Sequence, residues 1–100
     1  ILNTFPKSQR MVIVQAISNS ALQCLRLIVS ARSARLPRRK ANLLFELNVE
    51  LEVLRKLLTV AHTIGFLNTK RTENGMKQLL TLGKMCGGWQ KRYEVQNINH

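Results

Sequence analysis

The side chains best suited to chemistry in this chain are basic, and they cluster around a proline. Five of the sixteen basic residues fall in the stretch 32–40, on both sides of Leu36-Pro37: Arg32, Arg35, Arg38, Arg39 and Lys40. The 100 residues carry a net charge of +11, with no Asp and five Glu. An excess of this size costs self-repulsion and attracts phosphate groups. The cluster therefore predicts a contact site for nucleic-acid phosphates. The alternative is a solvated basic face that keeps a helical protein soluble.

Groups suited to catalysis or metal binding are few and scattered. Glu46 and Glu50 lie one helical turn apart, but a carboxylate-bridged metal site also needs Glu-x-x-His motifs on facing helices, and the sequence has no such pair. His62 falls near a helix end, and His100 in a polar tail. Gly87-Gly88 follows no strand, and no Lys-Ser/Thr pair completes a phosphate-binding loop. We therefore expect no enzymatic activity, no metal ion and no cofactor.

The two cysteines, Cys24 and Cys86, are far apart, and each falls inside an apolar helical stripe. This is typical of small core residues in a reducing compartment. No apolar run is longer than four residues, as at 11–14, and no secretory signal is visible at the start. We expect a cytoplasmic protein with no membrane partner.

Hydrophobic periodicity predicts three long helices, at about residues 7–31, 38–64 and 69–93, with a frayed tail at 94–100. The clearest pattern is a heptad-like seam on the middle helix: Leu44, Leu47, Leu51, Leu54, Leu58, Ala61 and Gly65. The first helix has an apolar face made of Ile13, Ile17, Ala21, Cys24 and Ile28. The third has apolar residues at helical spacing from Met76 through Leu79 and Cys86 to Trp89 and Tyr93.

Local signals set the expected ends of these helices. Thr4-Phe5-Pro6 is a plausible start for the first helix, and Leu36-Pro37 ends it because the residue before proline is driven out of the helical region. Gly65 is the expected C-cap of the second helix. Asn68 or Thr69 is the expected N-cap of the third.

Short turns between long helices predict an all-α, antiparallel up-and-down bundle that forms a single domain over residues 1–100. In this topology Lys91 and Arg92 join the basic cluster at one end, and Lys70 and Arg71 lie at the other end, where Glu73 partly balances them. The apolar faces are wider than three helices need to cover one another. We therefore expect a fourth helix, either from a segment before Ile1 or from another subunit.

Glycines are unusually frequent in the third helix. Gly83 and Gly87 are four residues apart and share a face, where another helix would be able to approach closely. An alternative is that Gly87-Gly88 marks the end of the helix.

Three stretches together resemble a known family: Phe5-Pro6-Lys7-Ser8-Gln9-Arg10, the segment 49–58 (VELEVLRKLL) and the segment 82–89 (LGKMCGGW). The chain resembles the accessory variability determinant (Avd) proteins of diversity-generating retroelements, small basic four-helix bundles related to proteins encoded in 23S ribosomal RNA intervening sequences. The ribosomal relatives carry an Asn-Ile-x-Glu-Gly-like stretch late in the first long helix. The region 27–33 lacks it, which favours the Avd branch.

This resemblance implies a non-catalytic accessory protein that assembles into a basic ring, a homopentamer in characterised relatives. It implies binding to the reverse transcriptase and to template RNA, with cDNA as a further ligand, in support of mutagenic cDNA synthesis. By the same resemblance, Gly83, Gly87, Gly88 and Trp89 serve packing and subunit contact. A base-stacking role for Trp89 is the alternative.

Two other functions are open at this stage. One is a stand-alone basic bundle that binds RNA or DNA without a polymerase partner. The other is a peripheral membrane protein, which is disfavoured because the apolar faces are needed for bundle packing.

Overall fold

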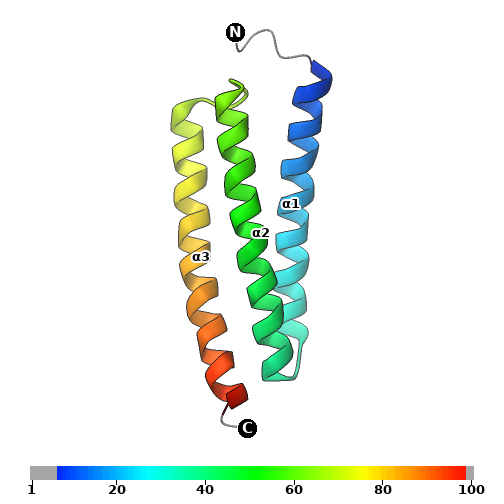
Figure 1. The fold of residues 1–100 in the computed structure, drawn as a ribbon, viewed down its shortest axis with the longest axis vertical. Helices are drawn as coiled ribbons and strands as arrows, with labels where there is room; N and C mark the ends of the chain where they lie inside the picture. Colours follow the sequence, from blue (N-terminus) through cyan, green and yellow to red (C-terminus); the bar gives the residue numbers. More distant parts are fainter. Residues whose placement is uncertain (1–6, 99–100) are drawn as a thin grey trace.

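The computed structural model of this chain is a bundle of three long α-helices joined by two short turns (Figure 1). α1 spans Lys7–Ser33, α2 spans Pro37–Thr63 and α3 spans Thr69–Ile98. The structure describes the backbone of residues 7–98 and the side chains of residues 9–92. Successive helices run antiparallel in an elongated body of 57 × 22 × 15 Å. The predicted all-α class and the three helices are confirmed.

The predicted end of the third helix at residue 93 is wrong, because α3 continues to Ile98. No proline or glycine follows Gly88, so the sequence after it contains no strong helix breaker. The proposed start at Thr4-Phe5-Pro6, the side chain of Tyr93 and the last two residues, with His100, lie outside the described residues.

Both ends of the first turn follow from Leu36-Pro37. Leu36 adopts an extended conformation, with φ −85° and ψ 132°, as expected for a residue that precedes proline. Pro37 is the first residue of α2, where its missing N–H group costs no hydrogen bond. This arrangement reverses the chain within residues 34–36 and fixes the position of the arginines on either side.

α2 ends one residue before the predicted position, since Ile64 is the C-cap and Gly65 is the residue that follows it. The φ of Gly65, 81°, lies in the left-handed region that favours glycine. The Phe66 N–H donates to the Ala61 carbonyl at 2.8 Å, and the Gly65 N–H donates to the His62 carbonyl at 3.0 Å. This pair of bonds is a Schellman motif, which satisfies carbonyl groups at the helix end.

Of the two predicted N-caps for α3, the structure selects Asn68. Its side-chain oxygen accepts a hydrogen bond from the Arg71 N–H at 2.8 Å. A bond from the N3 amide to the N-cap side chain satisfies one of the amides that have no partner within the helix.

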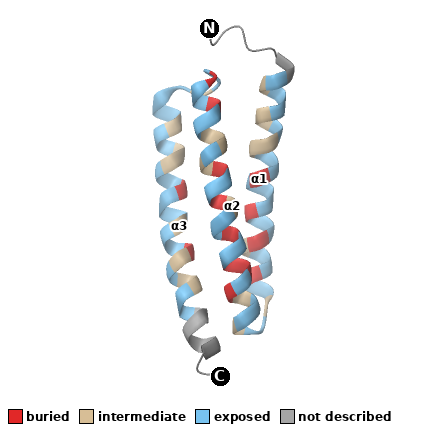
Figure 2. Ribbon diagram, in the orientation of Figure 1, coloured by how far each residue is buried: buried red, intermediate tan, exposed pale blue. Residues whose placement is uncertain are grey.

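The core follows α2, which packs against both neighbours, while α1 and α3 make only weak contact with each other. The predicted seam is confirmed over most of its length: Leu44, Leu47, Leu51, Leu54 and Ala61 are buried, and Leu44 has no exposed surface. Figure 2 shows the buried residues along α2 and the adjoining part of α1, with few on α3. Each fully buried leucine stabilises the fold by about 1.5–3 kcal/mol.

The predicted apolar face of α1 is only partly right. Cys24 is buried, but Ala21 is exposed, and the buried face turns toward Ser20, Leu27 and Ala31. The reason is that α1 packs closely against α2 alone. Only the side of its wide apolar surface that faces α2 is therefore buried. Ser20 is tolerated in this contact because its hydroxyl donates to Glu50 Oε2 at 2.6 Å.

Large apolar side chains are exposed on the outer helices. Leu22, Leu25 and Val29 are exposed on α1, and Leu82 and Met85 on α3. Several such residues on one helix exceed the isolated exposed side chains that are normal for a monomer. The wide apolar faces that the sequence predicts are therefore present, and part of each is not covered within the described chain.

The segment Gln9–Ser33 is long and apolar enough to cross a membrane, judged by length and composition only. This evidence is weak, since core helices of soluble proteins pass the same test. The absence of a membrane partner stays a prediction.

Replacing Gly65 by Ala should lower the free energy of unfolding by about 1–2 kcal/mol, because a side chain is disfavoured at positive φ. Urea unfolding followed by circular dichroism measures the change. Gly88→Ala is the matched control. Gly88 lies inside α3, and a Cβ there would meet nothing within 4 Å, so it should stabilise the helix by about 0.5–1 kcal/mol. Equal effects of the two substitutions would contradict the role of Gly65.

Candidate nucleic-acid interface

One end of the bundle gathers most of the predicted phosphate-binding residues. Arg32, Arg35, Arg38 and Arg39 are exposed around the α1–α2 turn. Figure 1 shows that α3 ends on the same side of the molecule as this turn. The basic end is defined by these exposed residues together with those from α3: Arg32, Arg35, Arg38, Arg39, Lys91 and Arg92.

The register of α2 against α3 explains how Lys91 and Arg92 reach this end. The Cys86 thiol donates to the Leu44 carbonyl at 3.1 Å, and Gly75 lies against Leu58. Extending this antiparallel register by about one and a half turns brings residues 91 and 92 level with the first turn of α2. Residues separated by more than fifty positions in sequence thus lie at one end of the bundle.

The charges at the start of α2 oppose the helix dipole. The first turn contains no acidic residue, and the N-cap Leu36 makes no side-chain hydrogen bond. A cation near a helix N-terminus is unfavourable by about 0.3–1 kcal/mol at an exposed site. Arg38 and Arg39 therefore do not stabilise this helix end, while an anion bound there would interact favourably with both arginines and with the backbone N–H groups.

Lys40 differs from the other members of the cluster. It is half-buried, and its Nζ donates to the Ala31 carbonyl at 2.8 Å and to the Arg32 carbonyl at 3.3 Å. Lysine at these carbonyls satisfies the end of α1 and has the favourable sign for the dipole there. Lys40 thus has a structural contact that the sequence pattern did not reveal, and its contact with nucleic acid stays a prediction.

The opposite end of the bundle carries more positive charge than predicted. Lys70 and Arg71 are exposed there, with Glu73 nearby in sequence. α1 also begins at this end and adds Arg10, which the predicted inventory omitted. The difference in charge between the two ends is present but smaller than the sequence interpretation gave.

The glycines of α3 fall into two groups. A Cβ on Gly75 would lie 3.1 Å from Leu58 Cδ1, so this residue marks the close approach of α3 to α2. A Cβ on Gly83 would make only ordinary contact, with Asn48 Oδ1 at 3.9 Å, and Gly87, like Gly88, has nothing within 4 Å. The close approach expected at Gly83 and Gly87 is therefore not made within the described chain.

Gly87-Gly88 does not end the helix, since both residues lie inside α3. Trp89, one residue further on, is half-buried and packs against the core cluster. Its neighbours Lys84, Met85 and Arg92 line a shallow hollow beside it. A subunit contact at this surface stays a prediction.

The thiols lack the features of a reactive site. Cys24 and Cys86 are free and buried. Burial raises the pKa of both, and for Cys24 the nearby Glu50 and Cys86 raise it further. A raised pKa favours the thiol over the nucleophilic thiolate at neutral pH. Within the described part of the chain, no three His, Cys, Asp or Glu side chains come together to hold a metal ion.

Fold and surface together define a class: an antiparallel α-helical bundle whose candidate site is a basic end. A comparison with protein-family models matches residues 1–93 to the family described as bAvd-like. The chain belongs to the bAvd-like family, which consists of Avd-type accessory proteins. Searches of curated proteins and of solved structures each gave no match.

Replacing Lys40 by Met should destabilise the fold by about 1–2 kcal/mol, because two carbonyls at the end of α1 lose a charged donor. Chemical unfolding measures this change. The control is Arg39→Met at the exposed neighbouring position, where we expect a change within about 0.5 kcal/mol. If Lys40→Met is as mild as the control, the capping contact does not stabilise the bundle.

Proposed function

We propose that this chain is a non-catalytic accessory protein of a diversity-generating retroelement. It acts in the cytoplasm as a basic homo-oligomeric ring, a pentamer, that binds the reverse transcriptase and template RNA and supports mutagenic cDNA synthesis. The observation that carries the proposal is the family match over residues 1–93. The free, buried thiols are consistent with a reducing compartment.

The basic end supports the RNA-binding part of this proposal. Two of its exposed arginines, Arg38 and Arg39, lie at a helix N-terminus, where a cation opposes the helix dipole and a bound anion would interact favourably. Its cationic side chains suit phosphate contacts that position the RNA, and these carry no sequence information directly. Affinity should therefore fall steeply as salt rises.

The exposed apolar faces support the assembly part. Leu25 and Val29 of α1 and Met85 of α3 are exposed although they are large and apolar. A fourth helix, from a segment preceding Ile1 or from another subunit, would cover α1 and α3 and complete a four-helix bundle. The glycines at 87 and 88 leave room on α3 for a close neighbour.

A stand-alone nucleic-acid-binding bundle is the second candidate, because the basic end lies within one chain and needs no polymerase to attract phosphate. Purification of the complete protein from its native host at moderate salt separates the two. A reverse transcriptase recovered with one defined transcript supports the accessory function. Heterogeneous RNA without a polymerase supports the stand-alone protein.

Replacing Arg35, Arg38 and Arg39 by Ala should weaken RNA binding and reduce the slope of log K against log salt by about 2–3, because up to three phosphate contacts are lost. Binding titrations at several salt concentrations measure the slope. Helix content by circular dichroism should stay unchanged, since all three side chains are exposed.

The matched control for the triple variant is Lys70, Arg71 and Lys77 replaced by Ala, which removes the same charge from exposed positions outside the basic end. We expect this variant to keep most of the affinity and of the salt slope. Equal losses in the two triple variants would mean that RNA responds to net charge alone and would rule out the basic end as the site.

Replacing Leu25 and Val29 by Lys tests whether the α1 face is covered. On an open surface, each substitution changes stability by less than about 0.5 kcal/mol. Beneath a fourth helix the pair should cost more than about 2 kcal/mol, because two charges would be buried without partners. Thermal unfolding of the complete protein measures the difference, and a neutral double variant would contradict the covered bundle.

A further inference from the structure

The outer side of α2 carries a second apolar surface, opposite the leucine seam. Phe45, Val49 and Val53 follow one another at intervals of four residues and are 56%, 50% and 43% exposed. Residues at this spacing lie on one side of a helix. Three large apolar side chains in a row on a solvent-facing helix mark a contact surface.

Acidic residues border this apolar row on the side of α1. Glu46 and Glu50 line a groove of about 350 Å³ together with Phe45, Val49 and two residues of α1, Gln23 and Leu27. We call it the acidic groove. Neither carboxylate forms an ion pair with a described residue, and only Glu50 has a hydrogen bond, from Ser20. Because two of the chain's five glutamates line it without a cation, the acidic groove is unsuited to RNA phosphates.

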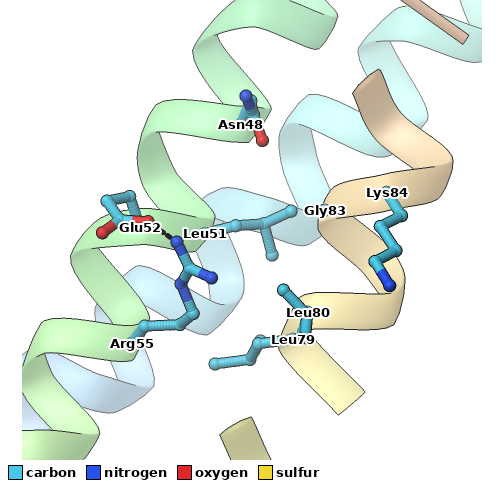
Figure 3. Close-up of a pocket in the computed structure, with 8 residues that line it drawn as sticks. All are labelled: Asn48, Leu51, Glu52, Arg55, Leu79, Leu80, Gly83 and Lys84. Carbon is cyan, nitrogen blue, oxygen red and sulfur yellow. Dashed lines mark ion pairs between the residues drawn. The ribbon is translucent and has the colours of Figure 1, made fainter. Parts of the chain in front are cut away.

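A complementary groove lies on the other side of α2, against α3. It measures about 210 Å³ and is lined by Asn48, Leu51, Glu52, Arg55, Leu79, Leu80, Gly83 and Lys84 (Figure 3). We call it the basic groove. Figure 3 shows Arg55 turned toward Glu52, with which it forms an ion pair, while Lys84 lies across the groove on α3. Lys84 is exposed and forms no ion pair with a described residue, so this groove has a net positive charge.

The basic groove also offers an apolar contact. Leu80 is 47% exposed at its edge. Gly83 presents no side chain, and a Cβ there would already touch Asn48 Oδ1 at 3.9 Å. The basic groove thus combines an exposed leucine with an unpaired lysine, beside a position without a side chain at Gly83. The acidic groove offers the matching features, the exposed Phe45 and Val49 and the unpaired Glu46.

We propose that the acidic groove of one copy packs against the basic groove of the next, with Glu46 beside Lys84 and Val49 against Leu80. This inference rests on the ring in the proposed function and names its subunit contact. The two grooves are different surfaces of one chain, so the contact is heterologous, and such contacts close into rings when the rotation between copies allows it.

The positions of the two grooves along α2 favour a ring over a filament. The acidic groove uses residues 45–50 of α2, and the basic groove uses residues 48–55 of the same helix. The two stretches overlap, so copies whose helices run parallel would meet with little displacement along the helix axis. Copies arranged in this way hold their basic ends on one side of the assembly.

Local charge complementarity is the argument for a second copy of this chain as the partner of each groove. Two chains that each carry +11 repel each other at long range. Association then depends on local complementarity, in which a patch of one sign meets a patch of the other. Both patches are present on this chain, and both have apolar surface beside the charge.

The test uses the charge-reversal variants Glu46→Lys and Lys84→Glu, with mass measured by light scattering after size-exclusion chromatography. Each variant alone places like charges together, and we expect subunit association to weaken by about tenfold or more. The double variant Glu46→Lys/Lys84→Glu exchanges the two charges within one chain, so every contact in a ring of any size again joins opposite charges. The double variant should therefore recover the mass of the wild-type assembly.

Lys70→Glu is the control for a change of the same charge at an exposed position outside both grooves, and it should keep the wild-type mass. Circular dichroism reports whether each variant folds. If both single reversals keep the wild-type mass, or if the double variant does not restore it, the assigned contact is wrong.

Outcomes for this contact and for the proposed function are separable. A wild-type assembly that binds RNA and ignores both reversals overturns only the contact. A wild-type chain that is monomeric at micromolar concentration overturns the ring and the contact together. Reversals that release the reverse transcriptase while leaving the assembly mass unchanged also overturn the contact, because the grooves would then bind the polymerase.

Discussion

The burial of one leucine seam is the constraint on which the rest of this structure depends. α2 is the only helix that packs closely with both others, and Leu44 at its centre is fully buried. The seam decides which side of α1 and which side of α3 face inward. The remaining surfaces of the helices, basic or apolar, face outward as a result.

Electrostatics at the α1–α2 turn shows how the fold tolerates a concentrated charge. Arg38 and Arg39 oppose the dipole of α2, at whose start they lie. The side chain of Lys40 instead donates to a carbonyl at the carboxyl end of α1, where a cation is favourable. One residue of the cluster thus stabilises the turn from which the arginines project. A structural contact and an excess of positive charge are thus combined in a single short segment.

The sequence was sufficient where the signal is local. Proline at 37, glycine at 65 and asparagine at 68 set helix ends through their own backbone or side-chain chemistry, and the leucine seam follows from spacing alone. The buried side of α1 was predicted less well, because the side that becomes buried depends on which neighbour is present. The end of α3 was missed because polar residues in a tail do not by themselves stop a helix.

The surfaces were harder to predict than the helices. The basic end followed from topology, but the contact of Lys40 with α1 requires knowledge of the distance between two backbones. The row of Phe45, Val49 and Val53 is visible in the sequence at intervals of four. Its meaning was hidden because a stronger pattern occupies the opposite side of the same helix, and only the packed bundle shows which of the two faces solvent.

The two short turns affect how fast the newly synthesised chain folds. Residues 34–36 and 64–68 are all that separate helices that pack side by side. Most close residue pairs lie within a single helix and are therefore near neighbours in sequence. Topologies dominated by such local contacts fold on the microsecond to millisecond scale. Each chain should thus reach its helical form soon after synthesis, and the slower, concentration-dependent assembly proposed above would then begin from folded chains.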